Sequence, residues 1–154
     1  MKNLFNLFKF SKVKDSKSTQ PLFDSIDNKD DSKDFTLSIW EDISEVYPYL
    51  VKLSENCDPS KKDGDIEYLC SKIYDIVHFS PILQKNLNWM NWDEGEQMVN
   101  DENFDFNSID TLTKCKLMTA ICRAERFSDG TIRHYVLNGT MLRIINSIKQ
   151  EAIG

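Results

Sequence analysis

Several features are scarce in this chain of 154 residues, and each absence excludes a class of protein. Five glycines and four prolines exclude a collagen-like or low-complexity chain. No apolar run approaches the roughly 20 residues that a membrane-spanning helix requires. Acidic residues outnumber lysine and arginine by 25 to 19. The resulting net charge of −6 argues against nucleic acid as the main partner, because phosphate binding requires a surplus of basic side chains.

The common catalytic and metal-binding motifs are also absent. The sequence has no P-loop, no G-x-S-x-G and no G-x-G-x-x-G, which lowers the expectation of a nucleotide enzyme or a common hydrolase. His78 and His134 belong to no H-E-x-x-H pattern, and no cysteine or histidine pair has the spacing of a zinc site. We therefore expect no metal and no cofactor, and we expect both histidines to be structural.

Cysteine is limited to four residues, Cys57, Cys70, Cys115 and Cys122. On a helix, Cys115 and Cys122 share one face two turns apart, so their Cα atoms are about 10 Å from each other, too far for a disulfide. We expect the cysteines to be reduced and to act as small core residues. Reduced cysteines imply a reducing compartment, which predicts a cytoplasmic protein.

What the chain does have is a marked charge asymmetry at its N-terminus. Residues 1–20 contain five lysines and one acid, whereas the rest carries 14 basic and 24 acidic residues. The first ten residues, MKNLFNLFKF, are not a signal peptide, because Asn6 and Lys9 interrupt the apolar stretch. On a helical wheel their apolar side chains form one broad side. Two interpretations stay open: a frayed tail, or a short amphipathic helix 1–10 that lets residues 1–17 contact a membrane surface or a partner weakly.

Residues 11–34 are mainly serine, lysine and aspartate, and such a composition cannot bury enough surface to offset the entropy of ordering. We expect residues 1–34 to be a flexible tether and residues 35–154 to form one domain. The apolar periodicity of that domain predicts an all-α bundle of about five to seven helices. The predicted helices are 38–46, 48–55, 65–78, a short helix around 82–90, and 109–126. A capping box runs from Ser38 to Glu41, and Pro48 predicts either a kink or two abutting helices. The predicted apolar stripes are Trp40, Ile43, Tyr47 and Leu50 in the first pair and Leu112, Cys115, Met118, Ile121 and Cys122 in 109–126.

The last forty residues contain two conflicting signals. Asn138-Gly139 between apolar runs is a strong signal for a β-hairpin. The apolar residues on either side nevertheless recur at i, i+3, i+4 and i+7, which is the spacing of helices. We therefore predict two helices joined at Asn138-Gly139, with Gly139 left-handed and Thr140 as the cap of the second helix.

Residues 117–130, LMTAICRAERFSDG, resemble a signature written L-x-T-A-I-x-R-x-x-R-F-x-[D/E]-G. It belongs to a small bacterial family classed as a domain of unknown function. Residues 139–149 resemble its following segment, G-T-x-L-R-I-x-x-x-[IL]-K, and the pair Trp89 and Trp92 before an acid and Gly95 is similar too. The resemblance covers about residues 80–150, and more weakly from residue 38. It implies a compact helical bacterial domain and no particular activity.

Two groups of charged residues are candidates for function. The first is Arg123, Arg126 and Asp129, which form either an anion or phosphate clamp or the charged frame of a turn, the interpretation that we favour. The second lies in residues 88–107, where two tryptophans accompany six acids. From this segment we predict a partner-binding surface made of Trp92, Asp93, Glu94, Glu96, Asp101 and Glu102, because tryptophan dominates binding hot spots and acids accelerate association with a basic partner.

Three functions remain in competition. The leading one is a non-enzymatic intracellular protein of the immunity or inhibitor type, which neutralises a protein partner such as a basic toxin or enzyme. The second is an uncharacterised enzyme with a site around Arg123, Arg126 and Asp129. The third is a membrane-peripheral accessory protein that uses residues 1–17.

Overall fold

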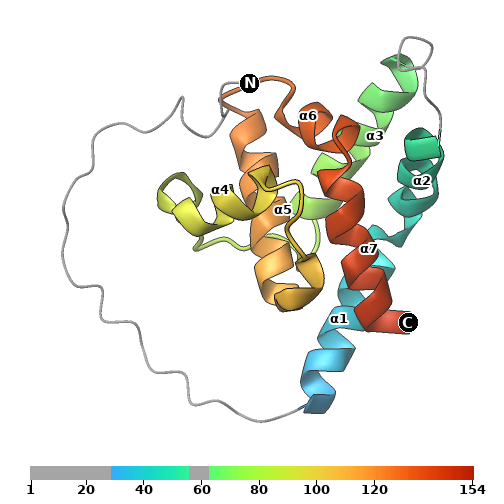
Figure 1. Ribbon diagram of the computed structural model, residues 1–154, viewed down its shortest axis with the longest axis vertical. Helices are drawn as coiled ribbons and strands as arrows, with labels where there is room; N and C mark the ends of the chain where they lie inside the picture. Colours follow the sequence, from blue (N-terminus) through green and yellow to red (C-terminus); the bar gives the residue numbers. More distant parts are fainter. Residues whose placement is uncertain (1–28, 56–62) are drawn as a thin grey trace.

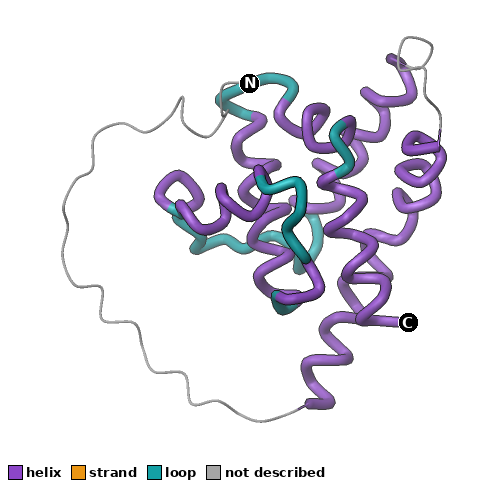
Figure 2. Tube along the Cα trace, viewed as in Figure 1, coloured by secondary structure: helices purple, strands orange, loops and turns teal. Residues whose placement is uncertain are grey.

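The computed structural model describes residues 29–55 and 63–154, which are entirely helix and connecting loop (Figures 1 and 2). The elements are α1 (Lys29–Ile43), η2 (Ser44–Val46), α2 (Tyr47–Glu55), α3 (Asp63–His78), η4 (Trp89–Asn91), α4 (Asp93–Asn100), η5 (Phe106–Ser108), α5 (Thr111–Glu125), α6 (Thr131–Leu137) and α7 (Thr140–Ile153), where η denotes a 3-10 helix. The predicted all-α bundle is therefore confirmed. The predictions for helix 1–10, Cys57 and most of the tether lie outside the described residues.

One continuous core holds the helices together. The apolar stripe of α5 supplies Cys115, Met118, Ile121 and Cys122, all fully buried. From α7 come Met141, Ile144, Ile145 and Ile148, which are fully buried as well. Figure 1 shows α7 beside α1, with α5 near the centre and α4 on the outer side of α5. These eight residues lie on the apolar faces that the periodicity predicted, because burying one helical face is the main gain in such a fold.

The first helix departs from the prediction. α1 begins at Lys29, upstream of the predicted domain start at Phe35, and Ser38 lies in its interior. The predicted capping box at Ser38 is therefore wrong. Ile43 is buried as predicted, and Ile39 and Thr36, which the predicted stripe did not include, are buried too and continue it toward the N-terminus. A helix whose packed face extends upstream begins upstream, whatever local cap sequence lies inside it.

The predicted break near Pro48 is confirmed as two abutting helices. η2 separates α1 from α2, and Pro48 occupies the second position of α2. Proline is tolerated in the first turn of a helix because its missing N–H would have no intrahelical partner there.

The predicted short helix around 82–90 is wrong. Residues 79–88 form an irregular segment that is bound to α5. Thr119 Oγ1 accepts from Gln84 N at 3.0 Å and donates to the Ile82 carbonyl at 3.2 Å. Ile82 itself is fully buried. Side chains from α5 thus satisfy backbone groups that a helix would have paired locally.

The two C-terminal helices are confirmed. Gly139 joins α6 to α7 with φ 87°, in the left-handed region where glycine is favoured. The cap of α7 differs from the prediction, because Asn138 Oδ1 accepts from the Thr140 N–H at 3.0 Å and Thr140 caps nothing. Across residues 29–55 and 63–154, every helix is too short or too polar to cross a bilayer.

Candidate protein-binding surface

The predicted binding residues lie on and beside α4, at the outer edge of the bundle (Figure 1). Val99 and Gly95 are buried on the inner face of α4. The half-buried ring of Trp92 covers Gly95 so closely that a Cβ at this position would lie 2.3 Å from a ring carbon. Gly95 is thus required for the close approach of the indole, and the Trp92–Gly95 pair fixes where α4 begins.

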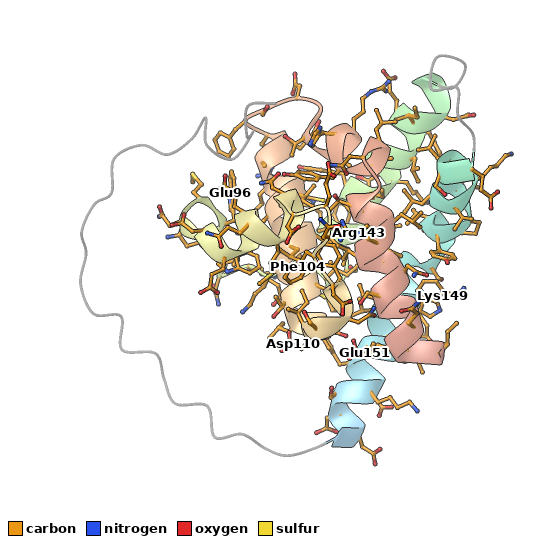
Figure 3. The ribbon with its side chains drawn as sticks, viewed as in Figure 1. Glu96, Phe104, Asp110, Arg143, Lys149 and Glu151 are labelled. Atoms are coloured by element: carbon orange, nitrogen blue, oxygen red, sulfur yellow. The ribbon has the colours of Figure 1, made fainter. Side chains whose placement is uncertain are left out.

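The acids of this segment divide into an outward group and one inward residue. Asp93 and Glu94, in the first turn of α4, are exposed, and so are Asp101 and Glu102 after its last turn. Acids in the first turn also suit the positive end of the helix dipole. Glu96 is half-buried, and Figure 3 shows it on α4. Burial raises the pKa of the Tyr135 hydroxyl, and the nearby Glu96 carboxylate adds to that rise.

The loop that follows α4 is held in place from both sides. Tyr135 Oη donates to Asn100 Oδ1 at 3.3 Å, which links the end of α4 to α6. Arg143 of α7 donates to the Phe104 carbonyl, and its guanidinium lies 4.9 Å from the centre of the Phe106 ring (Figure 3). The acids at 101 and 102 are therefore presented from a backbone that is tied to the core.

The stretch of chain that forms this surface carries charge of one sign. Residues 86–113 contain no lysine, arginine or histidine. Their seven acids are Asp93, Glu94, Glu96, Asp101, Glu102, Asp105 and Asp110. Four of the five acids predicted for binding are exposed together with the half-buried Trp92, while Glu96 is half-buried.

The arginines of the 117–130 segment donate hydrogen bonds to other segments of the fold. Arg123 donates from its two terminal nitrogens to the carbonyls of Leu87 and Lys85, each at 3.0 Å. Arg126 donates from Nε to Tyr74 Oη of α3 at 3.1 Å. Each arginine thus binds a different neighbouring segment, which favours the structural interpretation over an anion clamp.

The turn after α5 uses an acid that the sequence did not single out. Glu125 accepts from the Gly130 N–H at 2.9 Å and from the Ile132 N–H at 2.7 Å, so it caps the start of α6. Asp129, the acid of the predicted charged turn, is exposed. Glu125 takes this role because Gly130, with φ 89°, turns the chain back over the end of α5.

Two hollows in the described surface contain ionisable side chains. One of about 360 Å³ lies between α3 and the start of α6 and includes Cys70, Tyr74, Glu125 and Arg133. Arg123, Arg126 and Asp129 do not line it. Burial, reinforced by Glu125, raises the pKa of the Cys70 thiol to about 11, so it is protonated at neutral pH and a poor nucleophile. The second hollow, about 280 Å³, lies between α2 and α3 and is lined by Tyr49, Lys52 and Tyr68 among others.

Cys115, Cys122 and His78 pack within the fold. Cys115 and Cys122 are unpaired and fully buried, and burial raises the pKa of Cys115 to about 12. His78 stacks on Tyr74 with ring centres 4.0 Å apart. Within the two described ranges, no three histidine, cysteine or acidic side chains are grouped as metal ligands.

Sequence reasoning missed a buried polar cluster at the junction of α1, α5 and α7. Lys114 is 1% exposed, and its Nζ lies 2.7 Å from Glu151 Oε2 (Figure 3 labels Glu151). Thr111 Oγ1 donates to the same oxygen at 3.1 Å and lies 2.8 Å from Thr36 Oγ1. A signal was available, because Lys114 lies one turn before Met118 on the apolar stripe of α5. Leu112, which we expected on that stripe, is 41% exposed.

Comparison with known proteins gives a family and no activity. A family model described as "Family of unknown function (DUF6508)" matches residues 60–153. No curated protein matches the chain, and no solved structure does. The match begins after α2 and takes in the 117–130 segment together with all of α3 to α7.

Proposed function

Because the chain belongs to the family of unknown function DUF6508, which assigns no activity, we propose a function from the surface around α4: the chain is a non-enzymatic protein that binds a basic protein partner. The finer form of this proposal is a bacterial, intracellular immunity or inhibitor protein that covers the active site of a toxin or enzyme. The surface around α4 is the binding face. Trp92 is its apolar anchor, and Asp93, Glu94, Asp101 and Glu102 steer the partner.

The observation that carries the proposal is the exposed negative charge around α4, which is present although Asp101 Oδ1 also accepts from the Asn103 N–H at 2.9 Å. Arg123 and Glu125 are occupied with hydrogen bonds to backbone groups of the same chain. The outward acids of the α4 surface lie in a stretch of 28 residues without a basic residue. Exposed charge of a single sign is a poor way to stabilise a fold and an effective way to accelerate association with an oppositely charged protein.

An enzymatic function at Arg123, Arg126 and Asp129 has less support. General acid–base chemistry or an anion site needs side chains that converge on one place. Here Arg123 binds the 85–87 segment, Arg126 binds α3, and neither lines the adjacent hollow. We therefore rank the enzyme below the binding protein.

The test compares two charge-reversal variants with the same net charge. One replaces Asp93, Glu94, Asp101 and Glu102 with lysine, and its matched control replaces the exposed acids Asp30, Asp34, Glu41 and Glu55. Each variant is used as bait in cells that express the natural partner, and quantitative mass spectrometry measures the partner recovered. We expect the α4 variant to lose about tenfold or more in recovery, which corresponds to about 1.4 kcal/mol, and the control to retain most of it.

Circular dichroism of both variants establishes that they are folded. Association rates measured with the recovered partner should also fall as salt is raised, because exposed charges are screened over about 10 Å at 0.1 M ionic strength. Equal recovery with both variants, or rates insensitive to salt, would contradict the proposal.

A further inference from the structure

The hollow between α3 and the start of α6 brings charged groups of both signs together. Its lining includes Glu67 and Cys70 of α3, Glu125 at the end of α5, and Ile132 and Arg133 of α6. Its volume of about 360 Å³ lies in the range of small-molecule sites, which begins at about 300 Å³. No residue of the α4 surface is part of this lining, so the hollow is a separate place on the molecule.

The Cys70 thiol lies within electrostatic reach of all three charged groups. Burial is the main cause of the rise of its pKa to about 11. The Glu125 carboxylate adds to this rise, the Arg133 guanidinium opposes it, and the Glu67 carboxylate adds further. The thiol is therefore uncharged at neutral pH. Ile132, which is 2% exposed, is a second uncharged side chain of the lining.

The charged groups of the lining have hydrogen-bonding capacity for a ligand. Both carboxylate oxygens of Glu125 are fixed by N–H groups of the α5–α6 turn, at 2.9 and 2.7 Å, and each keeps a lone pair for another donor. Arg133 is half-buried, and its guanidinium carries five N–H donors, enough for a carboxylate beside a bond within the chain. Glu67 is exposed, so a ligand can reach its carboxylate.

A ligand with a single charge would match this lining poorly. An anion would meet the guanidinium of Arg133 but also the carboxylates of Glu67 and Glu125. A cation would meet the two carboxylates but also the guanidinium. A neutral ligand would remove water from these charges without replacing it, which is unfavourable. A zwitterion, which carries one charge of each sign, offers a partner to the acids and to the arginine alike.

We propose that this hollow binds a free α-amino acid with an uncharged side chain. The Arg133 guanidinium binds the carboxylate of the ligand, and the carboxylates of Glu67 and Glu125 bind its ammonium group. Cys70 and Ile132 form an uncharged surface for its side chain, where a further charge would lose water without gaining a partner. This is a ligand-binding function in addition to the binding of a protein partner.

The hollow between α2 and α3 also contains both signs of charge, in Lys52 and Asp65. Both of these side chains are exposed, whereas Glu125 and Arg133 of the α3–α6 hollow are half-buried. Exposed charges are screened by water and contribute little to holding a ligand, and partly buried ones contribute more. The α3–α6 hollow, at about 360 Å³ against about 280 Å³, is also the larger of the two. Both differences favour it as the amino-acid site.

Thermal unfolding of the full chain with a panel of soluble free amino acids tests the proposal. At about 10 mM, roughly a hundredfold above a dissociation constant of about 0.1 mM, a bound amino acid should raise the melting temperature by about 5 °C or more. Isothermal titration calorimetry then measures the dissociation constant of the most stabilising one. Its N-acetyl derivative lacks the ammonium group and its amide lacks the carboxylate, so each should bind about tenfold more weakly or worse.

Two pairs of variants locate the ligand in the hollow. Arg133→Gln should raise the dissociation constant of the amino acid about tenfold. Lys72→Gln, the same change of charge on α3 outside the lining, should change it less than about twofold. Ser71 is exposed and lines the hollow, so Ser71→Phe should fill part of it and abolish measurable binding. Its control, Ser54→Phe on the exposed side of α2, should bind like the natural protein.

A panel in which no amino acid raises the melting temperature would overturn the proposal. So would equal affinity for the N-acetyl derivative or the amide, or unchanged affinity in Ser71→Phe. Circular dichroism shows whether each variant is folded, and if Arg133→Gln is not, the Ser71→Phe and Ser54→Phe pair decides alone. The assay contains no protein partner, so its outcome is independent of the proposed function.

Discussion

At the scale of single residues, the two side chains of the Lys114–Glu151 ion pair differ in burial. The Lys114 ammonium is buried, whereas the Glu151 side chain is 40% exposed. Glu151→Ala leaves a buried charge without a counterion, which should cost about 3 kcal/mol of unfolding free energy. Lys114→Met removes the buried charge itself and leaves a carboxylate that water can reach, so we expect a loss under about 1 kcal/mol.

Urea unfolding monitored by circular dichroism measures both variants. The exposed pair Lys72–Glu45, 3.5 Å apart, is the control, and either partner should be replaceable at a cost below about 1 kcal/mol. Equal losses from Glu151→Ala and Lys114→Met would show that the pair behaves as a surface pair.

Asp110 should make stability depend on pH. Burial alone would raise the pKa of its carboxyl, but hydrogen bonds from the Thr113 hydroxyl and N–H hold the pKa below its usual value. Because the pKa is lowered in the folded state, the ionised Asp110 cap contributes its full stabilisation above the unfolded pKa of about 3.9. This stabilisation is lost as pH falls through the folded pKa.

Asp110→Ala should therefore destabilise the protein by about 1 kcal/mol at pH 7, where the 2.7 Å bond from the Thr113 N–H to Asp110 Oδ1 is lost. The difference in unfolding free energy between this variant and the natural protein should narrow as pH falls below about 4. Urea unfolding at several pH values checks this. Asp110→Asn, whose side-chain oxygen can still accept from the Thr113 N–H, is the control and should lose less unfolding free energy at neutral pH. A difference that stays constant down to acidic pH would contradict the assignment.

At the scale of elements, the 79–88 segment shows where local pattern is insufficient. Its apolar spacing is compatible with a helix, yet Thr119 and Arg123 bind its backbone in an irregular conformation. At Asn138-Gly139 the local turn signal predicts a hairpin, whereas the apolar periodicity predicts two helices. The periodicity is correct, because the apolar faces of α6 and α7 are both buried in one core.

Arg123→Met should release the 79–88 segment from α5. The Lys85 and Leu87 carbonyls would lose their charged donor, at a cost of about 1–3 kcal/mol. Hydrogen exchange followed by mass spectrometry should show amides of this segment exchanging about tenfold faster or more, as 1.4 kcal/mol of lost local stability implies. Arg126→Gln, which removes one exposed bond to Tyr74, is the control and should leave the segment unchanged. Unchanged exchange rates in Arg123→Met would mean that Thr119 and apolar packing hold the 79–88 segment on α5 without Arg123.

At the scale of the whole molecule, the domain extends beyond the family match. The match begins at residue 60, yet α1 packs along α7 and buries Ile39 and Ile43 completely. Tyr47 of α2 donates to Asn146 Oδ1 of α7 at 3.0 Å, and the Lys149 ammonium lies 4.6 Å from the centre of its ring. The helices before residue 60 are therefore part of the same core.

A chain restricted to residues 60–153 should consequently not fold cooperatively. Removing α1 and α2 exposes the apolar face of α7, and each large buried side chain contributes about 1.5–3 kcal/mol, comparable with the 5–15 kcal/mol that a domain has in total. Thermal unfolding by circular dichroism and binding of a hydrophobic dye measure this. A chain of residues 29–154 is the control and should unfold like the full protein. A sharp transition in the 60–153 chain would show that α1 and α2 are an appendage.

Local sequence patterns were enough to predict the helical class, the break at Pro48, the two C-terminal helices and, apart from Leu112 and Lys114, the core faces of α5 and α7. Each of these depends on apolar spacing or turn chemistry within a few residues, which is visible locally. The tertiary structure alone decided that α1 begins upstream of Ser38, that residues 79–88 are irregular, that Lys114 is buried and that Glu125 caps α6. Most of these depend on groups from other elements, such as Arg123 bound to carbonyls 36 and 38 residues away, and the apolar pattern does not encode those contacts.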